Sequence, residues 1–374
     1  MARKLQSDKW LFLATLALVC VSVVMVYSAS AVIADASADG AYAYVRKQAM
    51  WAVLGVAVLS FVMRVDYRTY RNEQLIWALL GVVALMLVAV LFSHPVKGAK
   101  RWFGLGGLGI QPSELAKVAA IFFTALMLDR RMHRIADLKY SLLPIALIVG
   151  GLGGLILVEP DYGTAATLAA IVAAMVFAAG LSYRYVFGLA AVILPIAYAV
   201  MMSADYRVKR ITAFLDPWAD PEGAGFHIIQ SLIAVGSGGW FGRGLMGGRQ
   251  KLFYLPEPHT DFIFSVIAEE LGLVGCTVVI ACFGVIAWRG LRAALHAPDR
   301  FGSFLALGIT TMVVAQALLN LSVVLSLMPT KGIALPLVSS GGSSLLVTLA
   351  SIGVLLNISQ HAVHDGALAE PGAA

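Results

Sequence analysis

Residues 10–33 read WLFLATLALVCVSVVMVYSASAVI, a run without a charged side chain. About 20 apolar residues suffice for a helix to cross the roughly 30 Å core of a bilayer. Basic residues precede the run (Arg3, Lys4 and Lys9) and small residues follow it near 36–38, as in a secretory signal peptide. The run is longer than the h-region of a typical signal peptide. It therefore predicts an uncleaved membrane-spanning helix.

The rest of the chain repeats this pattern. Of its 374 residues, 60% are apolar and 13% are charged, whereas soluble domains are about 45–50% apolar and about 25% charged. Only helices satisfy their own backbone within one segment in lipid. The predicted fold class is an all-α integral membrane protein with about ten transmembrane helices, which excludes cytosolic enzyme folds and nucleic-acid binders. The predicted spans are 10–33, 48–65, 75–93, 113–129, 142–159, 162–180, 184–203, 261–289, 301–328 and 343–361.

Lysine and arginine are more frequent in the loops on the N-terminal side once the long loop 204–260 is set aside. The positive-inside rule then predicts that both termini are cytoplasmic and that this loop is extracytoplasmic. Residues 1–362 are interpreted as one polytopic domain, and residues 363–374 as a flexible cytoplasmic tail. Lys97, Lys100 and Arg101 would lie outside against the rule, which indicates anionic ligands there.

The long loop contains a stretch, 226–239, that is too short to span and too apolar to lie wholly in water. It predicts a re-entrant or interfacial helix. Seven glycines follow between 236 and 248. Such backbone can offer N–H groups to a phosphate, but it equally describes a flexible loop. Arg243, Arg249, Lys251 and His259 accompany these glycines.

Charged residues inside spans are costly unless they are paired or hydrated. Glu114 and Lys117 are three apart on one helical face, which predicts an intrahelical ion pair. Pro160 breaks the fifth span beside Glu159 and Asp161, so both carboxylates can reach water or a cavity. The last outer loop, 328–344, contains Lys331 and Ser343 and is typical of a pocket lining or of a simple turn.

Thr260 is predicted to cap the eighth span, with Asp261 in its first turn. Asp261 is either a helix-stabilising aspartate or a base beside an anion site, and the neighbouring cations favour the base. Pairing Asp261 with Glu269 as in a glycosidase fails, because eight helical residues rise about 12 Å and glycosidase carboxylates lie about 5–9.5 Å apart. Glu269 and Glu270 are expected to bind polar partners, for which Gln316 and Asn320 are candidates.

Several sequence blocks, in order from about residue 10 to 361, resemble the SEDS family (shape, elongation, division and sporulation). They are GAKRW at 98–102, QPSELAK at 111–117, PDYGT at 160–164, FLDPWADP at 214–221, QSLIAVGSGG at 230–239, LPEPHTDFIF at 255–264, EELG at 269–272 and GGSS at 341–344. RQKLFY at 249–254 and PTKG at 329–332 resemble the division branch more than the elongation branch. Ser340 departs from the family, which usually has tyrosine before the GGSS turn.

The resemblance implies a peptidoglycan glycosyltransferase of septal cell-wall synthesis. Such an enzyme joins the 4-hydroxyl of a lipid II disaccharide to the anomeric carbon of a growing, lipid-pyrophosphate-linked glycan and displaces undecaprenyl pyrophosphate. Asp261 would then be the catalytic base. The expected substrate-binding residues are Lys100, Arg101, Gln111, Arg243, Arg249, Lys251, His259, Lys331 and Ser343. The expected supporting residues are Glu114, Lys117, Asp161, Glu269 and Glu270.

The resemblance also implies partners and a place in the cell. The partners are a class B penicillin-binding protein that supplies transpeptidase activity, other divisome proteins and membrane lipids. The expected location is the bacterial inner membrane at the septum. No cofactor and no dedicated metal-ligand cluster is evident, although Asp261 with pyrophosphate could recruit a divalent cation such as Mg²⁺. A lipid II flippase and a non-catalytic divisome scaffold are the alternatives. A transporter predicts polar blocks on both membrane faces, whereas these blocks lie mostly on the outer side.

Overall fold

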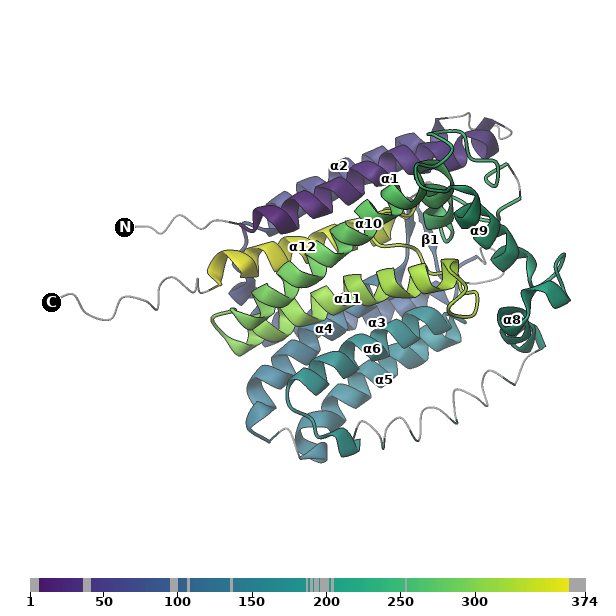
Figure 1. Ribbon diagram of the computed structural model, residues 1–374. Helices are drawn as coiled ribbons and strands as arrows, with labels where there is room; N and C mark the ends of the chain where they lie inside the picture. Colours follow the sequence, from purple (N-terminus) through teal and green to yellow (C-terminus); the bar gives the residue numbers. More distant parts are fainter. Residues whose placement is uncertain are drawn as a thin grey trace.

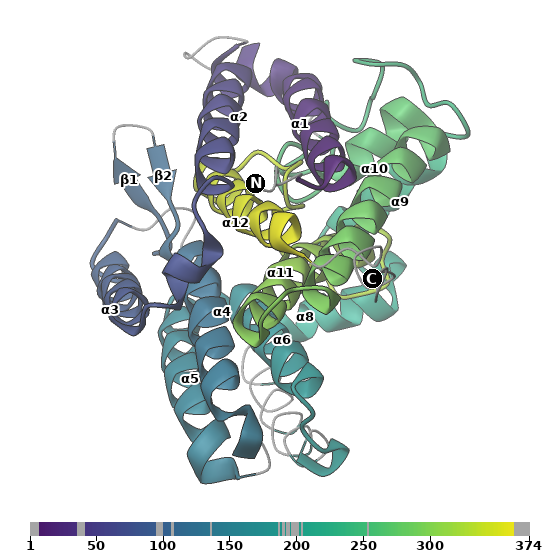
Figure 2. The same cartoon turned by 90° about the vertical axis from the view of Figure 1, so that its left-hand side faces the viewer.

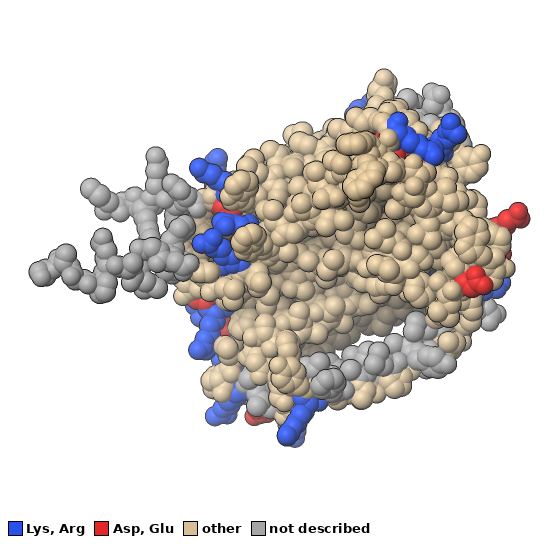
Figure 3. Space-filling model, in the orientation of Figure 1, with Lys and Arg blue, Asp and Glu red and all other residues tan. Residues whose placement is uncertain are grey.

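The computed structural model describes residues 7–362, apart from 36–41, 95–99, 106–107, 135–136, 253 and most of 186–204. Long helices lie side by side in one bundle (Figure 1). We call the end where α1 begins and α12 ends the terminal end, and the end where α4, α10 and α12 begin the loop end. The space-filling view shows an uncharged band between these two ends (Figure 3), as expected of a protein embedded in lipid.

The long helices coincide with the predicted spans. They are α1 (Lys9–Asp35), α2 (Ala43–Val62), α3 (Glu73–Val90), α4 (Pro112–Arg131), α5 (Leu143–Val158), α6 (Tyr162–Ala178), α10 (Ile263–Leu295), α11 (Arg300–Val324) and α12 (Gly342–His361). Within the described residues, seven helical segments are long and apolar enough to cross a membrane. The all-α membrane fold class is thus confirmed. The predicted span 184–203 and the tail 363–374 lie almost wholly outside the described residues.

The centre of the bundle is formed by α4, α11 and α12. α4 packs on α3, α6 and α11, while α12 packs on α2 and α10 on α1 and α11, so that α1 and α2 flank one side of the centre and α3, α5 and α6 the other (Figure 2). Nearly every residue of α4 from Pro112 to Leu128 is buried. Its alanines let neighbouring backbones approach closely, which is how helices associate where lipid removes the hydrophobic driving force.

The loop end carries the smaller elements. A hairpin of β1 (Phe103–Leu105) and β2 (Leu108–Ile110) and the helix α8 (Asp205–Leu215) were not predicted. α9 (Phe226–Ser237) is the helix expected within 226–239, and its 12 residues rise only about 18 Å. It packs on α10, where the Ser231 and Ser265 hydroxyls lie 2.8 Å apart. The remaining short turns are η1 (Tyr67–Arg71), η2 (Met132–Arg134), η3 (Leu138–Leu142) and η4 (Pro217–Ala219).

The start of α10 differs from its prediction. The helix begins at Ile263, its N-terminus has no side-chain cap, and the Thr260 hydroxyl instead lies 3.2 Å from a carboxylate oxygen of Glu257. Thr260 is therefore not the predicted cap. Asp261 precedes the helix and is held by the turn rather than by a position in the first helical turn.

α10 is also broken within its length. Gly272 has φ +64° and ψ −162°, values that interrupt the helix between the buried Glu269–Glu270 pair and the long remainder of the span. An L side chain rarely adopts this conformation. The N-terminal piece of α10 therefore forms a separate short helix at the loop end.

Candidate active site

Asp261 lies in a turn that is bonded to two other elements. The side-chain amide of Asn320 on α11 donates to the Asp261 carbonyl at 2.8 Å and to the Ile333 carbonyl at 2.7 Å. The Ser339 hydroxyl donates to the Thr260 carbonyl at 2.6 Å. Since Asn320 is 1% exposed, water competes little with these hydrogen bonds. They fix the backbone of Asp261 against the last outer loop.

His259 belongs to the same turn. Its ring lies edge-on to Tyr44 of α2 with centroids 5.0 Å apart, and its carbonyl accepts from the Ser340 backbone N–H at 2.9 Å. Ser340 stands where the family usually has tyrosine. The backbone bond at this position needs no particular side chain, so the departure leaves the turn around His259 intact.

The last outer loop contacts both Asp261 and the start of α6. A Cβ on Gly332 would lie 2.6 Å from an Asp261 carboxylate oxygen, and a Cβ on Gly163 would lie 2.5 Å from Lys331 Cε. Both glycines therefore make room for a functional side chain. The Lys331 ammonium lies 5.6 Å from the centroid of the Tyr162 ring. The loop thus contacts the Asp261 carboxylate at Gly332, while the side chain of the neighbouring Lys331 lies against the start of α6.

Burial lowers the pKa of Lys331 to about 8; Asp161 acts in the opposite direction, and Arg101 and Arg210 lower it further. Lys331 is therefore still largely charged at pH 7 and loses its charge a little above. A cation so poorly hydrated gains more from an anionic ligand than a surface lysine does.

Asp161 caps α6 and ties two other helices to it. Its carboxylate accepts from the Thr164 hydroxyl at 2.8 Å and from the Gln111 side-chain amide at 3.3 Å. The Gln111 backbone N–H donates to the Ser343 hydroxyl of α12 at 3.1 Å. The starts of α4, α6 and α12 thus meet beside Lys331. Gln111 and Ser343, expected to bind substrate, are engaged in this junction.

Arg101 and Lys100 differ in their surroundings. Arg101 donates to the carbonyls of Glu159 and Pro160 at 3.0 and 2.7 Å, which fixes the turn between α5 and α6. Lys100 is exposed. The Glu159 carboxyl is buried without a hydrogen-bond partner among the described residues. Burial raises the pKa of Glu159 to about 8, Asp161 adds to the rise and Arg101 opposes it, so this group is mostly protonated at pH 7.

Glu114 and Lys117 form the expected ion pair, 2.9 Å apart and buried. Lys117 also donates to the Gln316 side chain at 2.8 Å, and Gln316 donates to the Ala334 carbonyl at 3.2 Å. The embedded pair is thereby linked to the loop that contains Lys331. Gln316 and Asn320 hold this loop and the Asp261 turn, so their predicted pairing with Glu269 and Glu270 is wrong.

Glu270 instead pairs with Lys251. The two groups are 2.6 Å apart with side chains 0% and 2% exposed, and the Ser28 hydroxyl of α1 bonds to both. The expected contact of Lys251 with pyrophosphate does not fit this position, because its charge is already neutralised in the interior. Lys251 and Glu270 attach the Gly-rich loop to α1 and α10.

Glu269 binds the same Gly-rich loop through its carboxylate. Its carboxylate accepts from the Arg249 backbone N–H at 2.7 Å and from Arg243 at 3.3 Å. Arg243 is thus engaged with Glu269 rather than free for an anion. The Arg249 side chain is exposed, and no acidic partner for it occurs among the described residues. Of the three loop cations, Arg249 alone has the placement expected of a substrate contact.

The glycines of this loop serve close packing. A Cβ on Gly238 would lie 1.9 Å from the Ala268 carbonyl oxygen, and one on Gly242 would lie 2.1 Å from that of Glu270. The Arg243 N–H donates to the Glu269 carbonyl, and the Leu273 N–H to the Gly239 carbonyl, across the break at Gly272. These contacts favour close packing of the loop on α10 over a backbone that is open to a phosphate.

Sequence reasoning missed Gly332 as a member of the site and named Asn320 only as a candidate partner of Glu269 and Glu270. The signal for Asn320 is a polar residue in the apolar run 301–328, which needs a partner in lipid. The signal for Gly332 is its place directly after Lys331. The described residues contain no group of three or more His, Cys, Asp and Glu side chains arranged to hold a metal ion.

The fold and the site define a class: a multi-pass membrane protein with a carboxylate, a poorly hydrated lysine and exposed cations gathered at one end of its bundle. The family model for the cell cycle proteins FtsW, RodA and SpoVE matches residues 9–364. The chain belongs to this family, which is the SEDS family inferred from its sequence blocks.

Named relatives cover nearly the whole chain. A Geobacter metallireducens protein named "Probable peptidoglycan glycosyltransferase FtsW" is 45% identical over 94% of both chains. The Bacillus subtilis stage V sporulation protein E is 42% identical over 96% of this chain and 98% of its own length.

Solved structures have the same fold. A chain of a peptidoglycan synthase complex that coordinates polymerization and crosslinking has a TM-score of 0.79 at 34% identity, over 95% of this chain and 98% of its own. The rod shape determining protein RodA of Thermus thermophilus has a TM-score of 0.70 at 29% identity, over 97% and 99%.

Proposed function

We propose that the protein is a peptidoglycan glycosyltransferase that polymerises lipid II into glycan strands during septal cell-wall synthesis. The observation that carries the proposal is the contact of the Asp261 carboxylate with Gly332, the residue next to Lys331, at the loop end. The names of the FtsW relatives support the same activity. Their agreement with the division-type blocks at 249–254 and 329–332 favours the division branch.

Asp261 is the general base in this proposal. The sugar 4-hydroxyl is a weak nucleophile, and a carboxylate that accepts its proton during attack raises its reactivity. The new bond joins that oxygen to the anomeric carbon of the growing strand. The bond from this carbon to undecaprenyl pyrophosphate breaks, and the leaving group carries the electron pair away.

Lys331 is proposed to meet the charge that develops on the leaving pyrophosphate. A fixed cation in a poorly hydrated place stabilises such charge better than one in water. Lys100 and Arg249 are exposed at the loop end and would draw the anionic substrate toward Lys331. Arg101, Arg243 and Lys251 have protein partners, so we assign them to positioning rather than to substrate contact.

The partner and the orientation follow from the same proposal. The chain of the peptidoglycan synthase complex that this fold resembles supports a penicillin-binding protein of class B as the crosslinking partner, beside other divisome proteins. Both termini are proposed to be cytoplasmic, in the bacterial inner membrane at the septum, since the loop end must face the side where cell wall is made.

Reconstitution on lipid II tests the function. The full chain, with its transpeptidase partner in liposomes, should convert lipid II into a ladder of glycan products and release undecaprenyl pyrophosphate. Transfer of lipid II between leaflets without release of pyrophosphate would indicate a flippase instead. If neither polymerisation nor transfer occurs, the protein would be a non-catalytic scaffold. Chelation in the same assay, followed by addition of Mg²⁺, tests whether a divalent cation acts with Asp261 and the pyrophosphate.

A further inference from the structure

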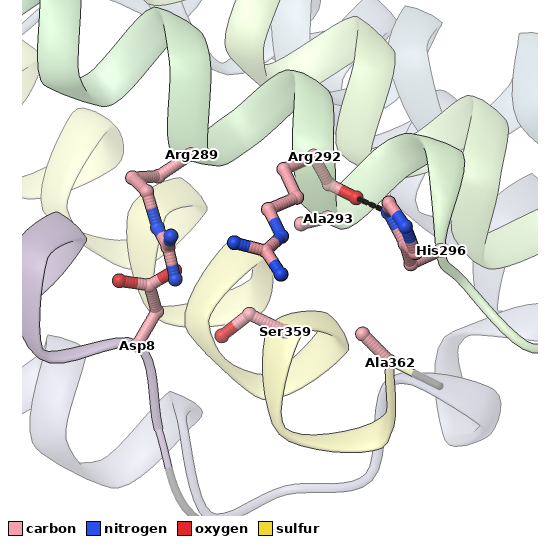
Figure 4. Close-up of a pocket in the computed structure, with 7 residues that line it drawn as sticks. All are labelled: Asp8, Arg289, Arg292, Ala293, His296, Ser359 and Ala362. Carbon is pink, nitrogen blue, oxygen red and sulfur yellow. Dashed lines mark hydrogen bonds and ion pairs between the residues drawn. The ribbon is translucent and has the colours of Figure 1, made fainter. Parts of the chain in front are cut away.

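A small pocket lies at the terminal end, far from Asp261. Its cavity is about 130 Å³ and is lined by side chains from the starts or ends of three helices (Figure 4). The lining residues are Asp8, Arg289, Arg292, Ala293, His296, Ser359 and Ala362. The proposed glycosyltransferase activity uses none of them.

The charge of the pocket is positive. Arg289 forms an ion pair with Asp8, whose side chain is 8% exposed, so this pair is neutral as a whole. In Figure 4 the Arg292 guanidinium extends into the space between Arg289 and His296. No acidic partner for Arg292 occurs among the described residues. A guanidinium directed into a cavity without an acidic partner favours an anionic ligand there.

Helix capping does not account for Arg292. The carbonyl of Arg292 at the end of α10 accepts from the His296 backbone N–H at 3.1 Å and lies 2.9 Å from His296 Nδ1. Two other arginines at this end have acidic partners: Arg71 is 2.8 Å from Asp129, and Arg130 pairs with Glu73. The positive-inside rule explains why basic residues are at this end. It does not explain why Arg292 is directed into a cavity.

The residues next to the pocket indicate that it lies at the depth of lipid headgroups. Trp10 and Trp288 are 65% and 72% exposed, and they are close in sequence to Asp8 and Arg289 respectively. Exposed tryptophans are typical of the boundary between lipid tails and headgroups. Leu291 and Leu295 on α10 are also exposed and offer an apolar surface beside Arg292. This combination favours a ligand with both a phosphate and acyl chains.

We propose that the pocket binds the phosphate group of an anionic phospholipid, with Arg292 as its principal contact. The bidentate fork of a guanidinium matches two phosphate oxygens. The acyl chains then lie along the exposed leucines of α10. Bound in this way, the lipid joins the start of α1, the end of α10 and the end of α12.

Lipid binding by the purified full chain tests the proposal. The chain in detergent is titrated with phosphatidylglycerol or phosphatidylcholine, and bound lipid is counted by native mass spectrometry beside the melting temperature. Phosphatidylglycerol should bind and raise the melting temperature more than phosphatidylcholine does. Arg292→Gln should reduce this binding at least threefold, and Arg292→Lys should reduce it less.

Arg300→Gln is the matched control, because Arg300 is an exposed arginine at the same end outside the pocket lining. It should leave phosphatidylglycerol binding unchanged. Equal binding by Arg292→Gln and the wild type would overturn the proposal. A second result would also overturn it: inorganic phosphate alone stabilises the wild type, Arg292→Gln abolishes this stabilisation, and phosphatidylglycerol adds nothing. The ligand would then be soluble phosphate.

Discussion

The Gly-rich loop 236–251 and the last outer loop 328–344 have similar compositions but different uses. Both combine glycines with basic residues at the loop end. In the first, Lys251 and Arg243 meet Glu270 and Glu269, and the glycines allow the backbone to contact α10. In the second, Lys331 has no carboxylate within ion-pair distance among the described residues, and Gly332 makes room for Asp261.

The difference teaches that a basic, glycine-rich loop is not by itself a phosphate site. Its role depends on which carboxylates the fold places opposite its cations. Where the cations form ion pairs with buried glutamates, they stabilise the loop. Where the loop instead contacts the partly exposed Asp261, we propose that its lysine acts on a substrate.

Breaking the first loop should have the largest effect on folding. Glu270→Ala leaves Lys251 buried without its partner, which typically costs about 3–5 kcal/mol. We expect a large drop in the melting temperature of the purified chain in one detergent. Glu73→Ala is the control, because its pair with Arg130 is exposed and should matter little. Equal melting temperatures for Glu270→Ala and the wild type would remove the structural role of Lys251.

Detaching the second loop should act on activity. Asn320→Ala removes both donors to the Asp261 and Ile333 carbonyls, and glycan polymerisation should fall about tenfold or more, since small displacements of catalytic groups are costly. Asn357→Ala is the control, because Asn357 is also a buried asparagine with two backbone bonds, at the terminal end. It should lower stability but not the turnover of folded protein. Similar turnover losses in both variants would show that Asn320 has no special link to Asp261.

The pH dependence of polymerisation should report Lys331. Its lowered pKa of about 8 means that the charge is present below pH 8 and is lost as the pH rises through that value, so the rate should fall on the alkaline side. In Lys331→Arg this fall should move to higher pH, because a guanidinium stays charged. Glu159, with a pKa raised to about 8, titrates in the same range. Glu159→Gln should therefore keep the alkaline fall; its disappearance in that variant would assign the fall to Glu159.

The smallest effect concerns the exposed cation of the first loop. Arg249→Gln should raise the KM for lipid II about threefold to tenfold without changing the melting temperature, because Arg249 is exposed and unpaired among the described residues. Arg243→Gln should instead lower the melting temperature slightly, because it removes the ion pair with Glu269. Initial rates over a range of lipid II concentrations separate the two. An unchanged KM in Arg249→Gln would exclude Arg249 from substrate capture.

Local patterns predicted what depends on local chemistry. Apolar runs located the helices because crossing lipid requires about 20 such residues, and the i, i+3 spacing located the Glu114–Lys117 pair. The break at Gly272 was missed, because a single glycine between apolar residues is also compatible with an intact helix. The α10 start was misplaced by two residues for a related reason: Thr260 suits a cap, but its hydroxyl bonds to Glu257 instead.

The sequence could not predict the side-chain partners that are far apart along the chain. The partners of Glu270 lie 19 residues away at Lys251 and 242 residues away at Ser28, and no spacing rule connects them. Gln316 and Asn320 were predicted as candidate partners of Glu269 and Glu270, but they bond to Lys117, Ala334, Asp261 and Ile333. The sequence blocks identified the family, whereas the division of its cations into paired and available ones required the fold.

Lipid II polymerisation by Asp261→Asn tests the central claim most directly. The amide keeps the shape of the side chain and removes its basicity. With the transpeptidase partner present, glycan products should be absent while the variant inserts and melts as the wild type does. Asp220→Asn is the control, since Asp220 is an exposed aspartate of the long loop, and it should retain activity. Polymerisation by Asp261→Asn within a few-fold of the wild-type rate would contradict the assignment of Asp261 as the base.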